Sequence, residues 1–321
     1  MDKTPYKKDW LVGTRIARGL IGARPGMKIP TIREYTNLFG CSRGIVQNAI
    51  DGLEEAGAVS LDRRGKSGTY LIAKDEKKLF GNAGLHFITG SMPAPLSIHH
   101  AGLATGICQA MNKCAAPFTF AFVQGSKNRA EALLRGVYDF VVVTQSAAEE
   151  YQSRFPELAL AFPLEGCVYS LPYTLYINRP GVGEVRDGMR VAADPTSTDQ
   201  WELTQLVCRG KDVRVLEMPY ISCNFAFLSG EADCVVMQGE LSARQPNLSN
   251  LFFALERRVS LADVSAIPIE CEKTEKLRQP VILVNRKNYG MDGILRSYLS
   301  GNLVSYIQNL VVEFKMAPQF Y

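Results

Sequence analysis

The sequence predicts an α/β chain in two parts: a small N-terminal domain of helices with one hairpin, and a larger body of two α/β lobes. Three observations favour this division. Helix-capping residues and a basic hairpin lie close together in residues 31–72. A twelve-residue pattern that begins at Ala132 recurs at Ala226. Residues 1–80 hold 15 basic and 9 acidic residues and residues 81–321 hold 21 and 23, so the net charge of +4 comes from the N-terminal part.

The first helix of the basic part is expected to begin at Thr31. Thr31-Ile32-Arg33-Glu34 has the capping-box pattern, in which the threonine hydroxyl and the glutamate carboxylate both accept hydrogen bonds from backbone N–H groups. Gly40 can adopt the left-handed conformation that ends a helix, so we expect the helix to run to Leu38 or Phe39. Ser42 then offers a second N-cap. The pattern predicts a helix, a tight turn and a second helix.

The second helix is expected to have one apolar and one polar face. Its apolar positions follow helical spacing and are Val46, Ala49, Ile50 and Leu53. The polar positions, which begin at the helix N-terminus, are Arg43, Gly44, Gln47 and Asn48. Arginine, glutamine and asparagine read base edges in the major groove of DNA, so the pattern indicates a recognition helix that ends at Gly57.

A hairpin with a basic tip is predicted next. Residues 58–61 and 69–72 have the composition of two short strands, and the loop between them carries Arg63, Arg64 and Lys66. A basic hairpin after a helix-turn-helix is typical of a wing that contacts phosphates or the minor groove. The alternative is an ordinary solvated charged face. We expect residues 1–73 to bind double-stranded operator DNA.

Several fixed spacings in this region resemble the winged-helix domain of GntR-type transcription factors. The similarity covers about the first 72 residues, including Pro30-Thr31-Ile32-Arg33-Glu34, Cys41-Ser42-Arg43 and Gly65-Lys66-Ser67-Gly68. The resemblance implies DNA contacts from Arg33, from Ser42 and Arg43, and from the wing tip Arg63 to Ser67. Gly44 replaces the usual threonine and Gln47 a frequent arginine, so the operator sequence cannot be transferred from the family. The DNA-binding residues expected are Thr31, Arg33, Ser42, Arg43, Gly44, Gln47, Asn48, Arg63, Arg64, Lys66 and Ser67.

An internal repeat organises the remainder of the chain after a charged, glycine-containing linker at residues 74–83. Residues 132–143 align with residues 226–237, and in each copy a helix ends at a glycine and an aspartate precedes an all-apolar strand. The preceding elements also repeat: strand 84–90, helix 102–114 and strand 118–123 correspond to strand 189–194, helix 200–208 and strand 213–218. Each half is therefore expected to be β-α-β-α-β.

Two connecting segments are expected between the lobes, the extended residues 168–178 and the returning residues 280–285, followed by one C-terminal helix from about Asp292 to Glu313. The arrangement resembles the bilobal type 2 periplasmic-binding-protein-like fold, and with the winged helix it resembles the YhfZ-type family, which is expected to act in transcriptional regulation. The effector domain would span residues 84–321. Lobe 1 would comprise about 84–170 plus 280–321, and lobe 2 about 174–279.

A ligand is expected between the lobes, because ligands of parallel α/β sheets bind beyond the carboxyl ends of the strands. Neutral polar residues predominate at those ends, and residues 194–198 lead into a helix N-terminus that could attract an anion. We therefore expect a small polar, anionic effector. The lining residues expected are Ser91, Met92, Gln124, Gly125, Ser126, Thr144, Gln145, Ser146, Asp194, Thr196, Ser197, Thr198, Tyr220 and Gln238.

Catalytic residues, metal ligands and cofactors are not predicted. His99 and His100 are adjacent but lack acidic or cysteine partners at ligand spacing, and the eight cysteines are scattered. We expect a non-enzyme, with a DNA-tethered enzyme of the same fold or a ligand-free architectural DNA-binding protein as the alternatives. No secretory signal or membrane span is recognisable, so a cytoplasmic protein is expected. A homodimer is expected because such regulators read two-fold symmetric operators.

Overall fold

The computed structural model describes residues 6–238 and 263–320, and of residues 6–9 only the backbone. Residues 1–5, 239–262 and 321, which belong to the predicted N-terminal domain and effector domain, lie outside the described residues. The chain divides into two compact units. Unit 1 comprises residues 1–88, 110–119 and 286–300, and unit 2 comprises residues 89–109, 120–285 and 301–321.

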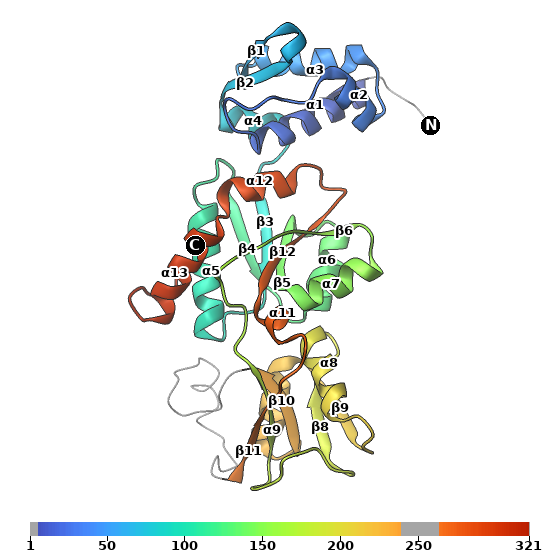
Figure 1. Cartoon of the computed structure of the whole chain (residues 1–321), viewed down its shortest axis with the longest axis vertical. Helices are drawn as coiled ribbons and strands as arrows, with labels where there is room; N and C mark the ends of the chain where they lie inside the picture. The colour runs from blue at the N-terminus through green and yellow to red at the C-terminus, as the bar shows by residue number, and fades with distance from the viewer. Residues whose placement is uncertain (1–5, 239–262, 321) are drawn as a thin grey trace. The chain divides into compact units, whose positions relative to one another are not determined.

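Unit 1 contains the predicted helix-turn-helix and hairpin (Figure 1). Its elements are α1 (Tyr6–Ile21), α2 (Ile32–Phe39), α3 (Arg43–Glu55), β1 (Val59–Arg63), a short 3-10 turn (Gly65–Ser67), β2 (Thr69–Lys74), α4 (Glu76–Asn82) and α12 (Met291–Tyr298). Strands β1 and β2 pair antiparallel, with Arg63 opposite Thr69. The winged helix-turn-helix predicted from the sequence is therefore present.

Helix α1 was not predicted, although it supplies a large part of the unit 1 core. Val12, Ile16 and Leu20 are buried at a spacing of four residues. That periodicity is visible in the sequence, but Gly13 and Gly19 interrupt the segment and charged residues precede it. Helix α1 packs against α3 and α4, so the helix-turn-helix rests on a chain segment that precedes it.

The segment 74–83, expected to be a linker, instead forms the end of β2 and helix α4. Asp75 caps α4 by accepting a hydrogen bond from the Lys78 amide (3.0 Å), and Leu79 and Phe80 are buried. The prediction of a linker was wrong because the charged residues occupy only the exposed side of the helix, whereas its two large apolar residues pack inward.

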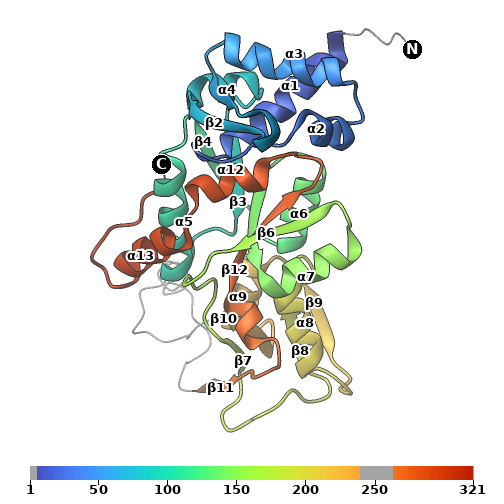
Figure 2. The same ribbon diagram turned by 45° about the horizontal axis from the view of Figure 1, so that its top comes forward.

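The C-terminal helix expected from Asp292 to Glu313 is two helices. Helix α12 ends at Tyr298, and α13 (Gly301–Val312) begins after a break at residues 299–300. The two helices belong to different units, and α12 lies beside α1 in both ribbon views (Figure 2). A Cβ atom built on Gly22, just after α1, would lie 2.9 Å from the Gly293 carbonyl carbon, so this contact requires glycine.

Unit 2 holds two five-stranded sheets with the same topology. Lobe 1 has the strand order β4-β3-β5-β12-β6 and lobe 2 the order β9-β8-β10-β7-β11. In each lobe the first three strands come from the predicted repeat, and the fourth, antiparallel strand is a connecting segment. The lobe 1 strands are β3 (Ile88–Met92), β4 (Phe118–Phe122), β5 (Phe140–Thr144), β6 (Leu158–Pro163) and β12 (Pro280–Asn285). The lobe 2 strands are β7 (Tyr173–Ile177), β8 (Arg190–Ala193), β9 (Arg214–Glu217), β10 (Cys234–Gln238) and β11 (Ser265–Pro268).

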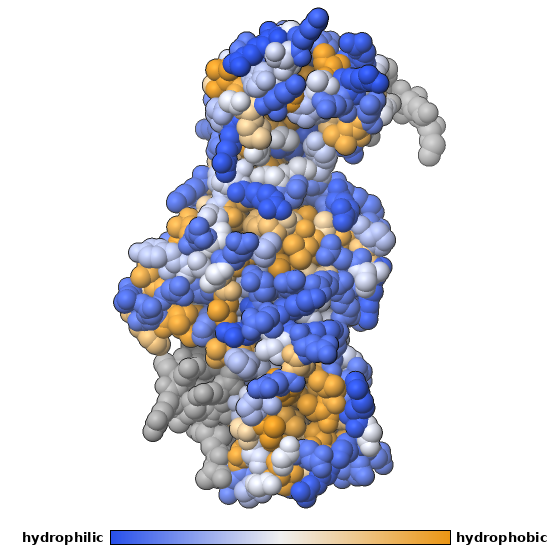
Figure 3. All heavy atoms as spheres, viewed as in Figure 1, coloured by the Kyte–Doolittle hydropathy of each residue, from blue (hydrophilic) through white to orange (hydrophobic). Residues whose placement is uncertain are grey.

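Helices flank both sheets, and each lobe has an apolar interior. The helices are α5 (Ile98–Met111), α6 (Ser126–Leu134), α7 (Gln145–Arg154), α8 (Thr198–Val207), α9 (Tyr220–Ser229), α11 (Thr274–Arg278) and α13. In lobe 1, Val141 and Val143 pack with Leu133 and Leu283. On the face shown in Figure 3, hydrophilic residues cover most of unit 1 and apolar residues gather in places over the lobes. None of the helices in the described ranges is long and apolar enough to cross a membrane.

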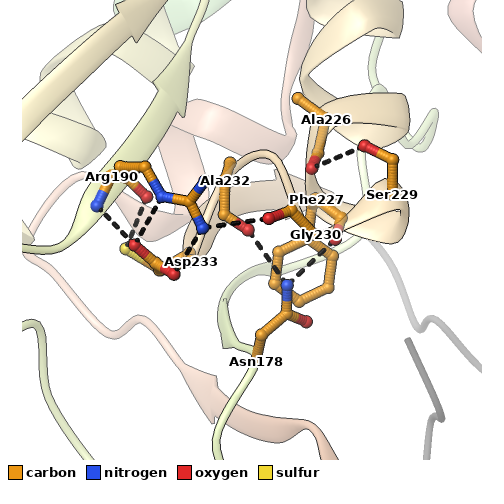
Figure 4. Close-up of polar contacts among 9 residues, drawn as sticks. Asn178, Arg190, Ala226, Phe227, Ser229, Gly230, Ala232 and Asp233 are labelled. Carbon is orange, nitrogen blue, oxygen red and sulfur yellow. Dashed lines mark hydrogen bonds and ion pairs between the residues drawn. The ribbon is translucent and has the colours of Figure 1, made fainter. Parts of the chain in front are cut away.

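The internal repeat is supported by matching hydrogen bonds. Asp233 accepts bonds from the Arg190 amide (2.8 Å) and from its guanidinium Nε (3.0 Å) and Nη2 (2.9 Å) (Figure 4). In lobe 1, Asp139 accepts a bond from the Thr89 amide (2.8 Å). The two repeated aspartates therefore join the start of β5 to β3 in lobe 1 and the start of β10 to β8 in lobe 2.

The connecting strands repeat a second feature. Asn178, which follows β7, donates to the Phe227 and Ala232 carbonyls (2.9 and 3.0 Å), as Figure 4 shows. Asn285, at the end of β12, donates to the Leu133 and Leu134 carbonyls (3.4 and 3.3 Å). Both asparagines thus satisfy carbonyls at the end of the helix that leads into the third strand. The repeat therefore includes the return strands, a relation that the aligned twelve residues did not show.

Candidate functional site

The helix-turn-helix has the caps that the sequence predicted. Thr31 Oγ1 accepts a hydrogen bond from the Glu34 amide (3.2 Å), and Glu34 Oε2 accepts one from the Thr31 amide (2.6 Å). Gly40 ends α2 with φ of 59°, and Ser42 Oγ caps α3 by accepting a bond from the Ile45 amide (3.4 Å). The turn between the two helices is therefore fixed by local hydrogen bonds.

The polar face of α3 faces solvent as predicted. Val46, Ile50 and Leu53 are buried, and Ala49 is half-buried. Arg43, Gly44 and Asn48 are exposed, and so are Thr31, Arg33 and Ser42. Gln47 is half-buried and its Nε2 donates to Asp51 Oδ1 (2.8 Å). Gln47 is therefore engaged within the helix, and the face available to a partner is narrower than the sequence indicated.

The wing cations fall into two groups. Arg63 forms ion pairs with Asp51 (3.1 Å) and Glu54 of α3. Arg64 bonds Asp62 Oδ2 (2.7 Å), and its guanidinium carbon lies 4.4 Å from the Tyr70 ring centroid. Lys66 and Ser67 are exposed at the tip. Arg63 therefore joins the wing to α3 through its ion pairs. Lys66 has no acidic partner among the described side chains.

Five of the predicted ligand residues meet where the two lobes touch. The Thr198 amide donates to Ser126 Oγ (3.3 Å), and Thr144 Oγ1 donates to a side chain one residue further along α8, Asp199 Oδ2 (2.8 Å). Gly125, with φ of 80°, lies so close to Thr196 that a Cβ atom there would be 2.2 Å from Thr196 Oγ1. The N-terminal ends of α6 and α7 in lobe 1 therefore contact the N-terminal end of α8 in lobe 2. We call this region the interlobe site.

Most of the other predicted ligand residues have local partners. Gln145 Nε2 donates to Glu149 Oε1 (3.0 Å) on the exposed side of α7, and the Gln124 carbonyl accepts a bond from Asn128. Tyr220 Oη accepts a bond from the Gln238 amide (3.1 Å). Ser91, Met92 and Ser146 are buried, and the Ser197 side chain makes no capping bond.

The N-terminus of α8 is less suited to an anion than the sequence indicated. Asp194 Oδ1 accepts bonds from the Thr196 amide (2.8 Å) and hydroxyl (2.7 Å), and Asp194 Oδ2 accepts one from the Tyr220 amide (2.9 Å). Asp199 adds a second carboxyl in the first turn of α8. These two acidic groups offset the positive end of the helix dipole. A ligand anion is therefore better placed elsewhere in the interlobe site.

Arg129 is a buried cation that the sequence reasoning missed. It lies on α6, is 2% exposed, and donates from Nη1 to the Val123 carbonyl (2.8 Å) and from Nη2 to Tyr169 Oη (3.0 Å). Its Nε has no hydrogen-bond partner among the described atoms. The Val123 amide donates to the Met92 carbonyl (2.9 Å), so the guanidinium lies near the carboxyl end of β3. The sequence gave only a weak indication of Arg129, which lies three residues after the predicted ligand residue Ser126.

Asp199 is the second buried charge that was missed. It lies on α8, is 6% exposed, and its Oδ1 has no hydrogen-bond partner in the described part of the chain. Burial raises the pKa of the Asp199 carboxyl to about 7, opposed by the Thr144 hydrogen bond. The neighbouring charges of Glu202 and Glu150 also raise the pKa, and that of Arg129 lowers it. Asp199 can therefore change its charge near neutral pH.

The side chains around Arg129 are mostly neutral. Burial raises the pKa of Tyr169 to about 12 and lowers the pKa of His100 to about 3, so both are uncharged at neutral pH. His100 lies edge-on to Tyr169, with ring centroids 5.0 Å apart. Tyr151 Oη donates to Ser126 Oγ (3.0 Å) and lies 2.5 Å from Thr198 Oγ1. The interlobe site therefore combines two buried charges with neutral hydrogen-bonding groups.

Two of the buried cysteines lie in surroundings that disfavour ionisation of their thiols. Burial raises the pKa of the thiols of Cys108 to about 11 and of Cys167 to about 12, which disfavours the reactive thiolate. Within the described ranges, no three His, Cys, Asp or Glu side chains form a group that could hold a metal ion.

Comparison with known proteins matches two regions of the chain. Residues 75–320 match the family model described as the YhfZ C-terminal domain, and residues 24–71 match a model described as a helix-turn-helix domain. The uncharacterized protein YhfZ of Escherichia coli (strain K12) is 29% identical over 321 residues, which is 100% of both chains.

Two solved structures align with most of this chain. The crystal structure of YhfZ from Shigella flexneri aligns with a TM-score of 0.58 at 26% identity, over 76% of this chain and 98% of that chain. An ABC transporter periplasmic substrate-binding protein from Coxiella burnetii aligns with a TM-score of 0.44 at 13% identity, over 70% of this chain and 96% of that chain. The predicted fold, a helix-turn-helix domain joined to a two-lobed α/β domain, is confirmed. Because the YhfZ model matches residues 75–320, the chain belongs to the YhfZ family.

Proposed function

We propose that this chain is a DNA-binding transcriptional regulator whose two-lobed domain binds a small polar metabolite and thereby alters operator affinity. The observation that carries the proposal is the capped helix-turn-helix, whose α3 presents exposed Arg43, Gly44 and Asn48 from its N-terminal end. A helix that enters the major groove reads bases with the residues near its N-terminus. The helix-turn-helix family match to residues 24–71 supports the same role.

Ion pairing narrows the set of DNA contacts. Arg33, Arg43 and Lys66 are exposed, and no acidic partner for them is found among the described side chains. These three cations can approach phosphates or bases without giving up an existing ion pair. Arg63 and Arg64 already have carboxylate partners, so contact with DNA would cost them those interactions. We assign DNA contacts to the first group and support of the wing to the second.

Fluorescence anisotropy tests this assignment with a labelled fragment of the DNA upstream of the coding sequence. Arg43→Ala should weaken binding about 5- to 150-fold, because a good arginine–base contact contributes about 1–3 kcal/mol. Arg209→Ala, an exposed arginine of lobe 2, is the control with the same change in net charge. Equal losses for Arg43→Ala and Arg209→Ala would mean that α3 does not read this DNA.

The interlobe site supports the sensing role. Buried Arg129 can pair with the anionic group of a metabolite, and Trp201 on α8 is half-buried three residues after Thr198. Ligand binding should therefore change the emission of Trp201, measured in a Trp10→Phe background, and should change the amount of DNA bound. Metabolites that alter neither signal would contradict the sensing role and favour an architectural DNA-binding protein instead.

The remaining parts of the proposal concern chemistry, assembly and location. We assign no catalytic step to the chain, because its buried thiols and neutral His100 offer no activated nucleophile or base. By analogy with GntR-type regulators, two copies would bind the two halves of an operator in the cytoplasm. Sedimentation with and without DNA tests the assembly.

A further inference from the structure

The two buried charges of the interlobe site come from opposite lobes and do not neutralise each other. Arg129 lies on α6 of lobe 1, and Asp199 lies on α8 of lobe 2. The charge of Arg129 is near enough to lower the pKa of Asp199, yet the two side chains form no ion pair in the described structure. Hydrogen bonds to neutral groups hold both side chains in place. Arg129 donates to the Val123 carbonyl and to Tyr169, and Asp199 accepts from Thr144.

Each of these charges keeps one polar atom without a protein partner. Arg129 Nε and Asp199 Oδ1 are both buried and make no hydrogen bond within the described part of the chain. A buried charged group without a full set of partners carries a large desolvation cost. A ligand that bonded both atoms would remove that cost at both positions. Such a ligand needs an acceptor at the arginine and a donor at the aspartate.

We propose that the interlobe site binds a zwitterion, with a carboxylate held by Arg129 and an ammonium group held by Asp199. This inference rests on the regulator function proposed above and specifies the chemical class of its effector. It replaces the purely anionic effector expected from the sequence, because a ligand with only negative charge would face Asp199 without compensation. Tyr169, which lies near both charges, and Thr144 supply the neutral polar surroundings.

A bound zwitterion would contact both lobes. The carboxylate pole is on lobe 1 and the ammonium pole is on lobe 2, so a bound zwitterion bridges them. Hydrogen bonds from Thr198 to Ser126 and from Thr144 to Asp199 already join the starts of α6 and α7 in lobe 1 to the start of α8 in lobe 2. A ligand with one charge could engage only one lobe strongly.

Isothermal titration of the full chain at pH 8 tests the proposal with defined probes. The probes are the proteinogenic α-amino acids, β-alanine and γ-aminobutyrate, followed, for each one that binds, by its hydroxy acid and its decarboxylated amine. We expect at least one zwitterion to bind, and its two singly charged analogues to bind at least 10-fold more weakly, since hydrogen bonds to charged groups contribute about 1.5–3 kcal/mol. Absence of binding by every zwitterion would overturn the proposal.

Two variants test the assigned residues. Arg129→Met and Asp199→Asn should each weaken the binding of that zwitterion about 10- to 150-fold, by the same hydrogen-bond energies. Arg129→Lys should restore part of the affinity. Lys276→Met and Glu149→Gln change an exposed ion pair between α11 and α7 and serve as controls. If Asp199→Asn binds the zwitterion as tightly as the wild type, Asp199 does not hold an ammonium group and the proposal fails.

The pH dependence separates a zwitterion from an anion. Asp199 must be ionised to hold an ammonium group, so affinity should fall as the pH decreases from 8 to 6, and Asp199→Asn should remove this dependence. Arg129 of α6, Glu150 of α7, Glu202 of α8 and Lys273 are the other charged groups that act on Asp199. Affinity that rises on acidification, with preference for the hydroxy acid, would instead show that protonated Asp199 donates to an anion.

Failure of this inference can be told apart from failure of the proposed function. If Arg43→Ala abolishes DNA binding and a metabolite other than a zwitterion releases the DNA, the regulator function stands and only the ligand class is wrong. If the chain binds a zwitterion but the Arg43→Ala result equals that of Arg209→Ala, the DNA-binding proposal is wrong instead.

Discussion

Replacement of Gly125 by alanine should force the two lobes apart at the interlobe site. A Cβ atom at Gly125 would lie 2.2 Å from Thr196 Oγ1 and 2.8 Å from Thr196 Cβ, whereas ordinary contacts are about 3.5–4.0 Å. The Gly125 backbone, with φ of 80° and ψ of 116°, adds strain, because this sparsely populated conformation costs alanine about 1–3 kcal/mol. Overpacking adds about 1–3 kcal/mol. We therefore expect a total cost of about 2–6 kcal/mol if the lobes stay closed.

Gly136 provides a control for the effect of a positive φ without a steric contact. It has φ of 75°, but nothing lies within 4 Å of the point that an alanine Cβ atom would occupy. Gly136→Ala should therefore cost only about 1–2 kcal/mol in free energy of unfolding. The difference between the two variants reports the close contacts at residue 125, which are with Thr196 and, at 2.9 Å, with Asn128 Nδ2.

Urea denaturation and Trp201 emission measure the two possible responses. If the lobes remain in contact, Gly125→Ala should lower the free energy of unfolding more than Gly136→Ala does. If the lobes open instead, the stability difference will be small, but Trp201 emission will shift and ligand affinity will fall. Thr196→Gly in the Gly125→Ala background should reverse the part of either effect that comes from the contact with Thr196, but not the backbone strain. If Gly125→Ala and Gly136→Ala have the same free energy of unfolding, the same Trp201 emission and the same ligand affinity, the contact between residue 125 and Thr196 is refuted.

Three other predictions concern titration and packing. Because burial raises the pKa of Asp199 from 3.8 to about 7, wild-type stability should decline as the pH rises from about 4 to above 7, by at most about 4 kcal/mol; Asp199→Asn should flatten this slope in denaturation curves. Gly22→Ala should displace α12 from α1 and cost about 1–3 kcal/mol, whereas Gly52→Ala in open space on α3 should be neutral or stabilising. Hydrogen bonds from Arg190 lower the pKa of Asp233, so Asp233→Asn should cost about 1–2 kcal/mol at pH 7 and less as the pH falls below about 4.

Local patterns in the sequence predicted several elements accurately. The capping residues of α2 and α3 act through hydrogen bonds to amides three residues away, and Gly40 ends α2 through its own φ angle. The repeat was readable for a similar reason, since Gly136 and Gly230 both adopt positive φ before equivalent strands. Such features depend only on residues that are close in the sequence, so they can be predicted without knowledge of the tertiary fold.

The candidate site could be predicted only in part. Strand ends identified Ser126, Thr144 and Thr198, which do meet between the lobes. Arg129 and Asp199 were missed because a charged residue on a helix ordinarily faces solvent, and only long-range packing shows that both are buried. The same limit explains α4, whose charged residues suggested a linker although Leu79 and Phe80 are buried.

The sequence by itself determined the winged helix-turn-helix, the two repeated α/β halves and the polar residues at the strand ends. The tertiary structure alone decided that the connecting segments β7 and β12 enter the sheets as equivalent antiparallel strands, that α12 lies against α1, and that two opposite charges are buried between the lobes. The physical reason is the range of the interactions. Caps, turns and periodic faces are set within a few residues, whereas burial, strand pairing and charge compensation join residues far apart in the chain.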